Sequence, residues 1–146
     1  MLSLILTLDH RRLEGLIDEF LANPNLPLYD VIWKAYKNHI YWEEEILFKR
    51  VTDTSLFAII RGLETEHGSM WILLKQTEEL LRSNEIEGAK EKIREFMRVL
   101  LEHDGAEEGS IYQFLESLSD EEQAKLILED IALAEPPRDW KCHAIT

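Results

Sequence analysis

Four long stretches of this chain repeat apolar residues at intervals of three and four positions, which is the periodicity of an amphipathic helix. A shorter fifth helix is predicted to begin at Ser119-Asp120-Glu121-Glu122, which has the composition of a capping box. The four long helices are expected over about residues 3–21, 28–50, 56–82 and 86–118. Four amphipathic helices joined by short turns predict an all-α fold, an up-down-up-down four-helix bundle with a short extra C-terminal helix.

The length and composition fit one domain of this kind. The chain has 146 residues, of which 45% are hydrophobic, so it can bury one core but is too short for two domains of ordinary size. The bundle domain is predicted to span residues 1–135. Pro136-Pro137 ends the helical part, and residues 136–146, with Cys142-His143, are expected to form a flexible C-terminal tail rather than a further metal site.

Charge and cysteine content bear on partners and location. The formal net charge is -13, with 16 basic against 29 acidic side chains, which argues against nucleic acid or an anionic membrane surface as a main partner. The apolar start, from Met1 to Leu8, has no basic segment before it and is too short to span a membrane. The one cysteine, Cys142, is compatible with a reducing compartment, so we expect the protein to be cytoplasmic.

Each of the four long apolar stripes contains one histidine, and two of these histidines are followed four residues later by a glutamate. Residues four apart on a helix project from the same side, so each His-Glu pair can reach one point in the interior. A buried carboxylate without a partner costs several kcal/mol, roughly, and therefore needs a cation nearby. The chain thus predicts a dinuclear metal centre built from His10, His39, Glu43, His67, His103 and Glu107.

The two halves of the chain repeat one arrangement. In the first half, His10 is followed 29 residues later by His39, and in the second half, His67 is followed 36 residues later by His103. Both His39 and His103 begin a His-x-x-x-Glu-Glu segment. Two similar helical hairpins related by a pseudo-twofold axis would place equivalent half-sites face to face. The second glutamates, Glu44 and Glu108, lie about 100° around their helices from the first ones and are expected to reach solvent or donor groups in neighbouring helices, with solvated surface charge as the favoured role.

The alternative without a metal is that each histidine is a hydrogen-bonded core residue, which is the commoner role of a single buried histidine. Four histidines on four core stripes, with two carboxylates among them, favour metal binding instead. Another dinuclear class, the ferritin-like bundles, needs Glu-x-x-His on two helices. Glu64 and His67 provide one copy, but Leu100 stands where His103 would need its glutamate, so this class is disfavoured.

The donor types indicate which metal is expected. Imidazole and carboxylate ligands suit iron, manganese or zinc, and the absence of cysteine among them argues against copper(I) and iron–sulfur clusters. Glu43 and Glu107 can each bridge two metals, leaving a position for an oxo, hydroxo, water or diatomic ligand. We expect two iron ions, bridged by oxo or hydroxo, with zinc or manganese as the alternatives.

From His10 to about Leu115 the chain resembles the hemerythrin-like, or HHE cation-binding, family. The most specific stretch is His39-Ile-Tyr-Trp-Glu43-Glu44-Glu45-Ile-Leu-Phe48, which is similar to the family's His-x-x-x-Glu-Glu-x-x-Leu-Phe run. The resemblance implies a four-helix bundle with a non-haem di-iron centre. It makes terminal ligands of the four histidines and bridging ligands of the two glutamates, namely His10, His39, His67, His103, Glu43 and Glu107.

The chain departs from the oxygen-carrying hemerythrins on its third helix. Those proteins have a His-x-x-x-His pair there, whereas Leu63 and Trp71 stand four residues from His67. A set of four histidines and two glutamates is more similar to the branch that includes iron–sulfur cluster repair and nitric-oxide-responsive proteins. With only Cys142 available, a donor role like that of the longer repair proteins is not expected.

These features lead to a functional expectation with two alternatives. The first is a di-iron protein that binds or senses O2, NO or peroxide, or handles iron, under oxidative or nitrosative stress. The second is a di-iron peroxidase or NO reductase, which would turn over with a reductant. The third is a structural or interaction module that a metal merely stabilises. The pattern identifies neither catalytic residues nor a redox partner.

Overall fold

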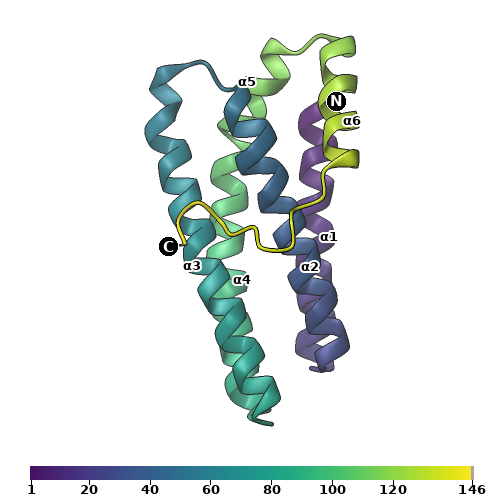
Figure 1. The fold of residues 1–146 in the computed structure, drawn as a ribbon, viewed down its shortest axis with the longest axis vertical. Helices are drawn as coiled ribbons and strands as arrows, with labels where there is room; N and C mark the ends of the chain where they lie inside the picture. The colour runs from purple at the N-terminus through teal and green to yellow at the C-terminus, as the bar shows by residue number, and fades with distance from the viewer. Residues whose placement is uncertain (146) are drawn as a thin grey trace.

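Helices α1 to α4 lie side by side in alternating directions in the computed structural model of this protein, which describes residues 1–145 (Figure 1). This arrangement confirms the all-α bundle expected from the sequence. Its helices are α1 (Leu2–Ala22), α2 (Leu26–Trp42), α3 (Phe57–Arg82), α4 (Ile86–Glu108), α5 (Ile111–Leu118) and α6 (Glu121–Leu133). Three short helical turns complete the described elements, η1 (Glu43–Leu47), η2 (Phe48–Arg50) and η3 (Thr54–Leu56).

A layer of polar side chains divides the interior into two apolar cores. On α1, Leu2 and Leu6 belong to one core, Leu13 and Ile17 belong to the other, and His10 lies between them. The same order, apolar residues of one core, a histidine, then apolar residues of the other, recurs along α3 and from α4 into α5. The amphipathic stripes therefore bring their histidines to one level of the bundle.

Two tyrosines on α2 fix its register against α3. The Tyr29 hydroxyl donates to the Leu74 carbonyl oxygen at 2.7 Å, and the Tyr36 hydroxyl donates to the His67 carbonyl oxygen at 2.7 Å. The two tyrosines are seven residues apart, which is about two helical turns. The two carbonyl groups that accept from them on the antiparallel helix α3 are also seven residues apart. Because both tyrosines are buried, these bonds hold α2 and α3 in the one alignment that places His67 opposite the end of α2.

The second and fourth predicted helices are shorter than expected. The α-helical part of the second ends at Trp42 and continues as the π-helical turn η1, which buries Glu43 and Glu44 together. A π turn is a wider turn that is often found at functional sites. The fourth ends at Glu108, followed by Gly109, before α5 begins. Periodicity missed both interruptions because apolar residues continue on each side of them.

The ends of α3 are defined by a capping side chain before it and a left-handed residue after it. Asp53 caps η3 by accepting a hydrogen bond from the Ser55 N–H at 2.9 Å. After α3, Asn84 adopts φ 57°, a left-handed conformation that asparagine tolerates better than most residues and that ends helices. The capping box before α6 is present, but it pairs Asp120 with Gln123 and so lies one residue later than predicted.

Helix α6 and the chain after it pack back onto the bundle. Ile127 of α6 enters the core that contains Leu2 and Leu6. Residues 134–145 then cross the face of α2 and reach α3 (Figure 1). Cys142, in this segment, is 1% exposed. The expectation of a flexible tail is therefore wrong, since apolar contacts and hydrogen bonds hold this segment in place. None of the helices within residues 1–145 combines the length and apolarity needed to cross a bilayer.

The tyrosine bonds can be tested by removing each hydroxyl. We expect Tyr29→Phe and Tyr36→Phe each to lower the free energy of unfolding of the metal-free protein by about 1 kcal/mol, the usual net value of a buried hydrogen bond. The hydroxyls are roughly 10 Å apart along α2, so the double variant should lose about the sum. Urea unfolding followed by circular dichroism measures this. A double variant no less stable than either single one would contradict two independent bonds.

Candidate metal centre

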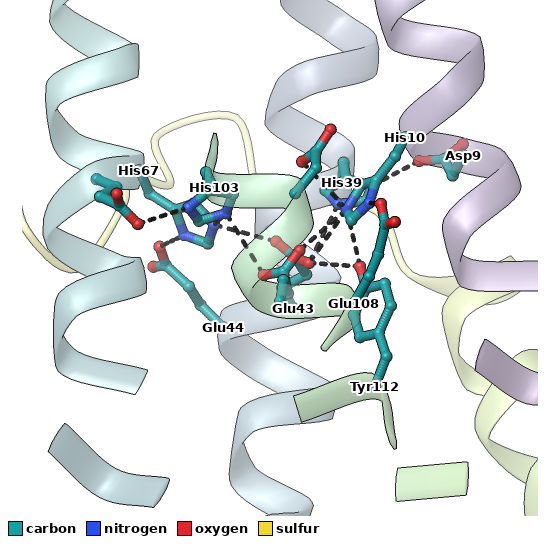
Figure 2. A network of polar contacts seen from close by, with 12 residues as sticks. Asp9, His10, His39, Glu43, Glu44, His67, His103, Glu108 and Tyr112 are labelled. Carbon is teal, nitrogen blue, oxygen red and sulfur yellow. Dashed lines mark hydrogen bonds and ion pairs between the residues drawn. The ribbon is translucent and has the colours of Figure 1, made fainter. Parts of the chain in front are cut away.

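The six residues predicted as metal ligands meet in the polar layer between the two cores (Figure 2). None of them is more than 5% exposed. Their ligand atoms form two overlapping groups, each drawn from two histidines and both glutamates. The first group is His10, His39, Glu43 and Glu107, and the second is His67, His103, Glu43 and Glu107.

Each glutamate offers one oxygen to each histidine pair. Glu43 has Oε2 3.1 Å from His39 Nε2 and Oε1 3.0 Å from His67 Nε2. Glu107 has Oε1 2.9 Å from His10 Nε2 and Oε2 3.4 Å from His103 Nε2. Both carboxylates therefore span the two groups, which is the arrangement that a bridging carboxylate requires.

Within each pair the two histidines turn the same ring nitrogen toward each other. The Nε2 atoms of His10 and His39 are 3.1 Å apart, and so are those of His67 and His103. Two nitrogen ligands about 2.1 Å from one metal and at right angles to each other are also separated by about 3 Å. Each pair thus has the spacing of adjacent ligands on one cation.

The other nitrogen of every ring faces a carboxylate. His10 Nδ1 is 2.7 Å from Glu108 Oε2, and His67 Nδ1 is 2.7 Å from Glu44 Oε2. His39 and His103 make the corresponding contacts, at 2.6 Å to Asp9 and at 3.1 Å to Glu66. A carboxylate that accepts from Nδ1–H fixes the tautomer and leaves Nε2 free to bind a metal.

These contacts follow the repeat seen in the sequence. The acidic residue directly before the first histidine of each half, Asp9 or Glu66, contacts the second histidine of the same half. The second glutamate of each half, Glu44 or Glu108, contacts the first histidine of the other half. The two halves are thus related by a pseudo-twofold axis through the site, as their spacing predicted.

Unpaired oxygens in the interior test whether a cation fits. Among residues 1–145, Glu43 Oε1 and both carboxylate oxygens of Glu107 and of Asp104 are buried without a hydrogen-bond donor. Leaving carboxylate oxygens unpaired away from water costs several kcal/mol, roughly, so a native structure supplies a partner. For Glu43 and Glu107 the partner that the facing Nε2 atoms also require is a metal cation. The residues present therefore fit a dinuclear metal cluster.

The electrostatics of the cluster show how strongly it attracts positive charge. Burial opposes the charged form of His10, but the adjacent carboxylates of Glu107 and Glu43 outweigh it and raise its pKa to about 12. The same opposition of burial and nearby carboxylates raises the pKa of His39 to about 9 and that of His103 to about 10. Burial also works against the charged form of Glu43, yet the neighbouring histidines hold its pKa well below the usual range. Without a metal the rings hold protons, which an entering cation displaces.

The two ends of the centre differ in what surrounds them. The Tyr112 hydroxyl donates to Glu43 Oε2 at 2.7 Å and lies 3.0 Å from His10 Nε2. At the corresponding place in the other half, four residues after Glu44, Phe48 stacks on His67 with ring centroids 6.0 Å apart. A polar hydroxyl thus borders one histidine pair and an apolar ring borders the other.

Sequence reasoning placed the six proposed ligands together but misjudged the residues behind them. Glu44 and Glu108 were expected to be solvated, yet Glu44 is 1% exposed and both hold a histidine. The expectation is wrong because the second glutamate of each motif faces a neighbouring helix. Asp9 and Glu66 were not singled out, although each directly precedes the first histidine of its half. Tyr112 carried no signal beyond its place on an apolar stripe.

Comparison with known proteins agrees with this arrangement. A family model described as the hemerythrin HHE cation-binding domain matches residues 2–115. The chain belongs to this family. It is therefore a cation-binding domain, and the match covers all six converging residues, from His10 to Glu107. No curated protein and no solved structure matches the chain. The match ends before α6, so the domain boundary proposed at residue 135 stays a prediction.

The carboxylates behind the histidines make a direct test of the site. We expect Glu44→Gln and Glu108→Gln each to weaken metal binding by roughly 10- to 100-fold, because each removes the charged acceptor that orients a ring. Metal affinity is measured by competition with a chelator. The matched control is Glu102→Gln, an exposed position on α4, which should bind like the unmodified protein. Equal affinities for all four proteins would contradict the role assigned to Glu44 and Glu108.

Proposed function

We propose that this protein is a non-haem di-iron protein of hemerythrin type. His10 and His39 would hold one iron, His67 and His103 the other, and Glu43 with Glu107 would bridge them. One observation carries the proposal, which is that each buried carboxylate directs its two oxygens to different histidine pairs. A single mononuclear site would not use two carboxylates in this way.

Iron is proposed on the basis of the donor set. Two imidazoles and two shared carboxylate oxygens at each position suit iron, with zinc and manganese as the other metals that these donors accept. When bound, two irons supply redox chemistry and open coordination positions. Once the rings have released their protons, the six side chains carry a negative formal charge from the two carboxylates, which favours a bound cation.

We infer that the ligand is a small molecule such as O2, NO or peroxide. The six residues are 0–5% exposed, so what reaches them must be little larger than water. Tyr112 supplies a hydroxyl at this point, and burial together with the nearby Glu107 carboxylate raises the pKa of its phenol well above the ordinary value. Tyr112 therefore keeps its proton, which it gives to Glu43 Oε2 here and could turn toward a ligand bound at the His10 side of the centre.

The proposed role is binding or sensing of such a ligand, or handling of iron, during oxidative or nitrosative stress in the cytoplasm. The chain's own residues support binding more directly than turnover. They supply a closed cluster with one hydroxyl donor, Tyr112, among apolar neighbours such as Phe48. A peroxidase or NO reductase would use the same position but would also consume a reductant.

Metal content and optical spectra test the proposal. Protein purified without tags or chelators should contain two irons per chain, and its ligand-to-iron charge-transfer bands should change with dithionite, azide and nitric oxide. Zinc, or bands that no ligand alters, would favour a structural module and overturn the proposal. Steady consumption of a reductant with peroxide or NO would instead identify an enzyme.

Removing one bridging carboxylate tests the shared centre. We expect Glu107→Ala to lose one or both metals, because the substitution deletes one oxygen from each position and leaves His10 and His103 facing a void. Elemental analysis measures the loss, and thermal unfolding should show a less stable bundle. Two metals per chain in this variant would contradict the assignment of Glu107 as a bridge.

Tyr112→Phe separates ligand binding from metal binding. The variant keeps all six proposed ligands and should retain both metals. It removes the hydroxyl that would turn its single proton from Glu43 Oε2 to a bound ligand, so azide or NO should bind more weakly, by up to about tenfold for the loss of one hydrogen bond. Optical titration measures the change. The control is Tyr41→Phe, on the outer face of α2 against Trp140, which should leave ligand affinity unchanged.

A further inference from the structure

The segment after α6 lies outside the family match and yet reaches the metal centre. Trp140 anchors it on the bundle, with its ring 5.1 Å from that of Tyr41 and 6.0 Å from that of Trp71. The Trp140 indole N–H donates to Glu45 Oε1 at 3.3 Å. Two residues before Trp140, the carbonyl oxygen of Arg138 accepts a hydrogen bond from Lys37 Nζ at 3.4 Å. The segment from Arg138 to Ile145 is therefore held at several points.

Beyond Trp140 this segment contacts Glu44, the carboxylate behind His67. The Cys142 thiol donates to Glu44 Oε2 at 3.1 Å, and the backbone N–H of His143 donates to Glu44 Oε1 at 2.9 Å. Glu44 Oε2 is also the atom that accepts from His67 Nδ1. Both oxygens of this buried carboxylate thus have donors from the C-terminal segment, which fixes the plane of the carboxylate toward the ring.

Gly68 allows the segment to come this close to α3. A Cβ atom placed on Gly68 would lie 2.8 Å from the Cβ of Ala144, closer than real side chains approach. Gly68 directly follows His67 in the chain. The glycine therefore provides the space in which Ala144 sits beside the metal-facing histidine.

The pseudo-equivalent carboxylate in the other half has a different anchor. Arg11 Nη2 donates to Glu108 Oε1 at 2.7 Å and to Glu108 Oε2 at 3.0 Å. The Glu108 side chain is 21% exposed, whereas that of Glu44 is 0% exposed. A guanidinium near the surface thus holds one carboxylate. The Cys142 thiol and the His143 N–H hold the other, and the His143 ring lies beside it, with Nδ1 3.6 Å from Glu44 Oε1.

We propose that residues 138–145 are an integral part of the metal centre and position Glu44, and through it His67. The proposal rests on the metal site of the proposed function. It makes the two metal positions unequal, because His67 depends on the C-terminal segment through Glu44, while His10 depends on Arg11 through Glu108.

The test replaces the donors one at a time and records each metal position separately. Cys142→Ala removes the thiol donor, and Cys142→Ser retains a hydroxyl donor. His143→Pro removes the backbone N–H together with the imidazole, and His143→Ala, which removes the imidazole alone, separates the two effects. Arg11→Met is the counterpart in the other half. The first readout is the ¹⁵N NMR spectrum of the histidine rings in the metal-free protein, assigned with single histidine substitutions. The second is zinc titration against a chelator, followed on the same resonances.

We expect Cys142→Ala and His143→Pro to shift the ring nitrogens of His67 and to weaken zinc binding at the His67 and His103 position, by roughly tenfold or more for the two changes combined. Zinc binding at the other position should change by less than about twofold. Cys142→Ser should recover most of the loss, which a purely structural role of the thiol would not predict. Arg11→Met should show the reverse pattern.

The matched control is Arg94→Met, an exposed arginine on α4. The proposal is overturned if the His67 resonances of Cys142→Ala match those of the control, or if both metal positions weaken equally. If the unmodified protein bound fewer than two metals, the proposed function would fail. The His67 resonances of the metal-free variants would still decide whether the segment positions this ring. Should His143→Pro unfold, the Cys142 pair alone decides the outcome.

Discussion

Carboxylate groups buried opposite imidazoles are the interaction on which this structure depends. Glu43 and Glu107 lie in the middle of a small bundle, where an unpaired charge costs several kcal/mol, roughly, and removing its partner is strongly destabilising. Partners for these two residues come from all four long helices. The polar layer therefore constrains how the helices align, while the apolar cores above and below it exclude water and strengthen each electrostatic contact.

The shell around this layer gives the site its precision. Every Nε2 atom faces inward because the opposite nitrogen contacts a carboxylate, from Asp9, Glu44, Glu66 or Glu108. Because the two halves of the chain repeat, these histidine–carboxylate contacts occur in two equivalent sets. The copies then diverge at their edges, where a tyrosine replaces a phenylalanine and a C-terminal segment replaces an arginine. The two histidine pairs therefore offer the same donor atoms but have different residues behind them. Metals bound at the two pairs would for this reason differ in their properties.

Sequence patterns predicted the bundle and the six converging residues, but several features escaped them. The π turn at Glu43–Leu47 interrupts no apolar stripe, so periodicity read one continuous helix there. Glu44 resembled any solvent-facing glutamate, because position on its own helix does not reveal the neighbouring helix that buries it. Cys142 followed two prolines and polar residues, which suggested a flexible end. Its burial comes from contacts with η1 and α3 that local composition does not encode.

What the sequence determined by itself is local and periodic. It fixed four amphipathic helices, one histidine in each apolar stripe, and a glutamate one turn beyond two of them, since side chains four residues apart share a helix face. Only the tertiary structure decided which carboxylate lies behind which histidine and what closes over Glu44. Those hydrogen bonds join residues 23 to 99 positions apart. Contacts at such separations depend on how whole helices pack, which no helical period specifies.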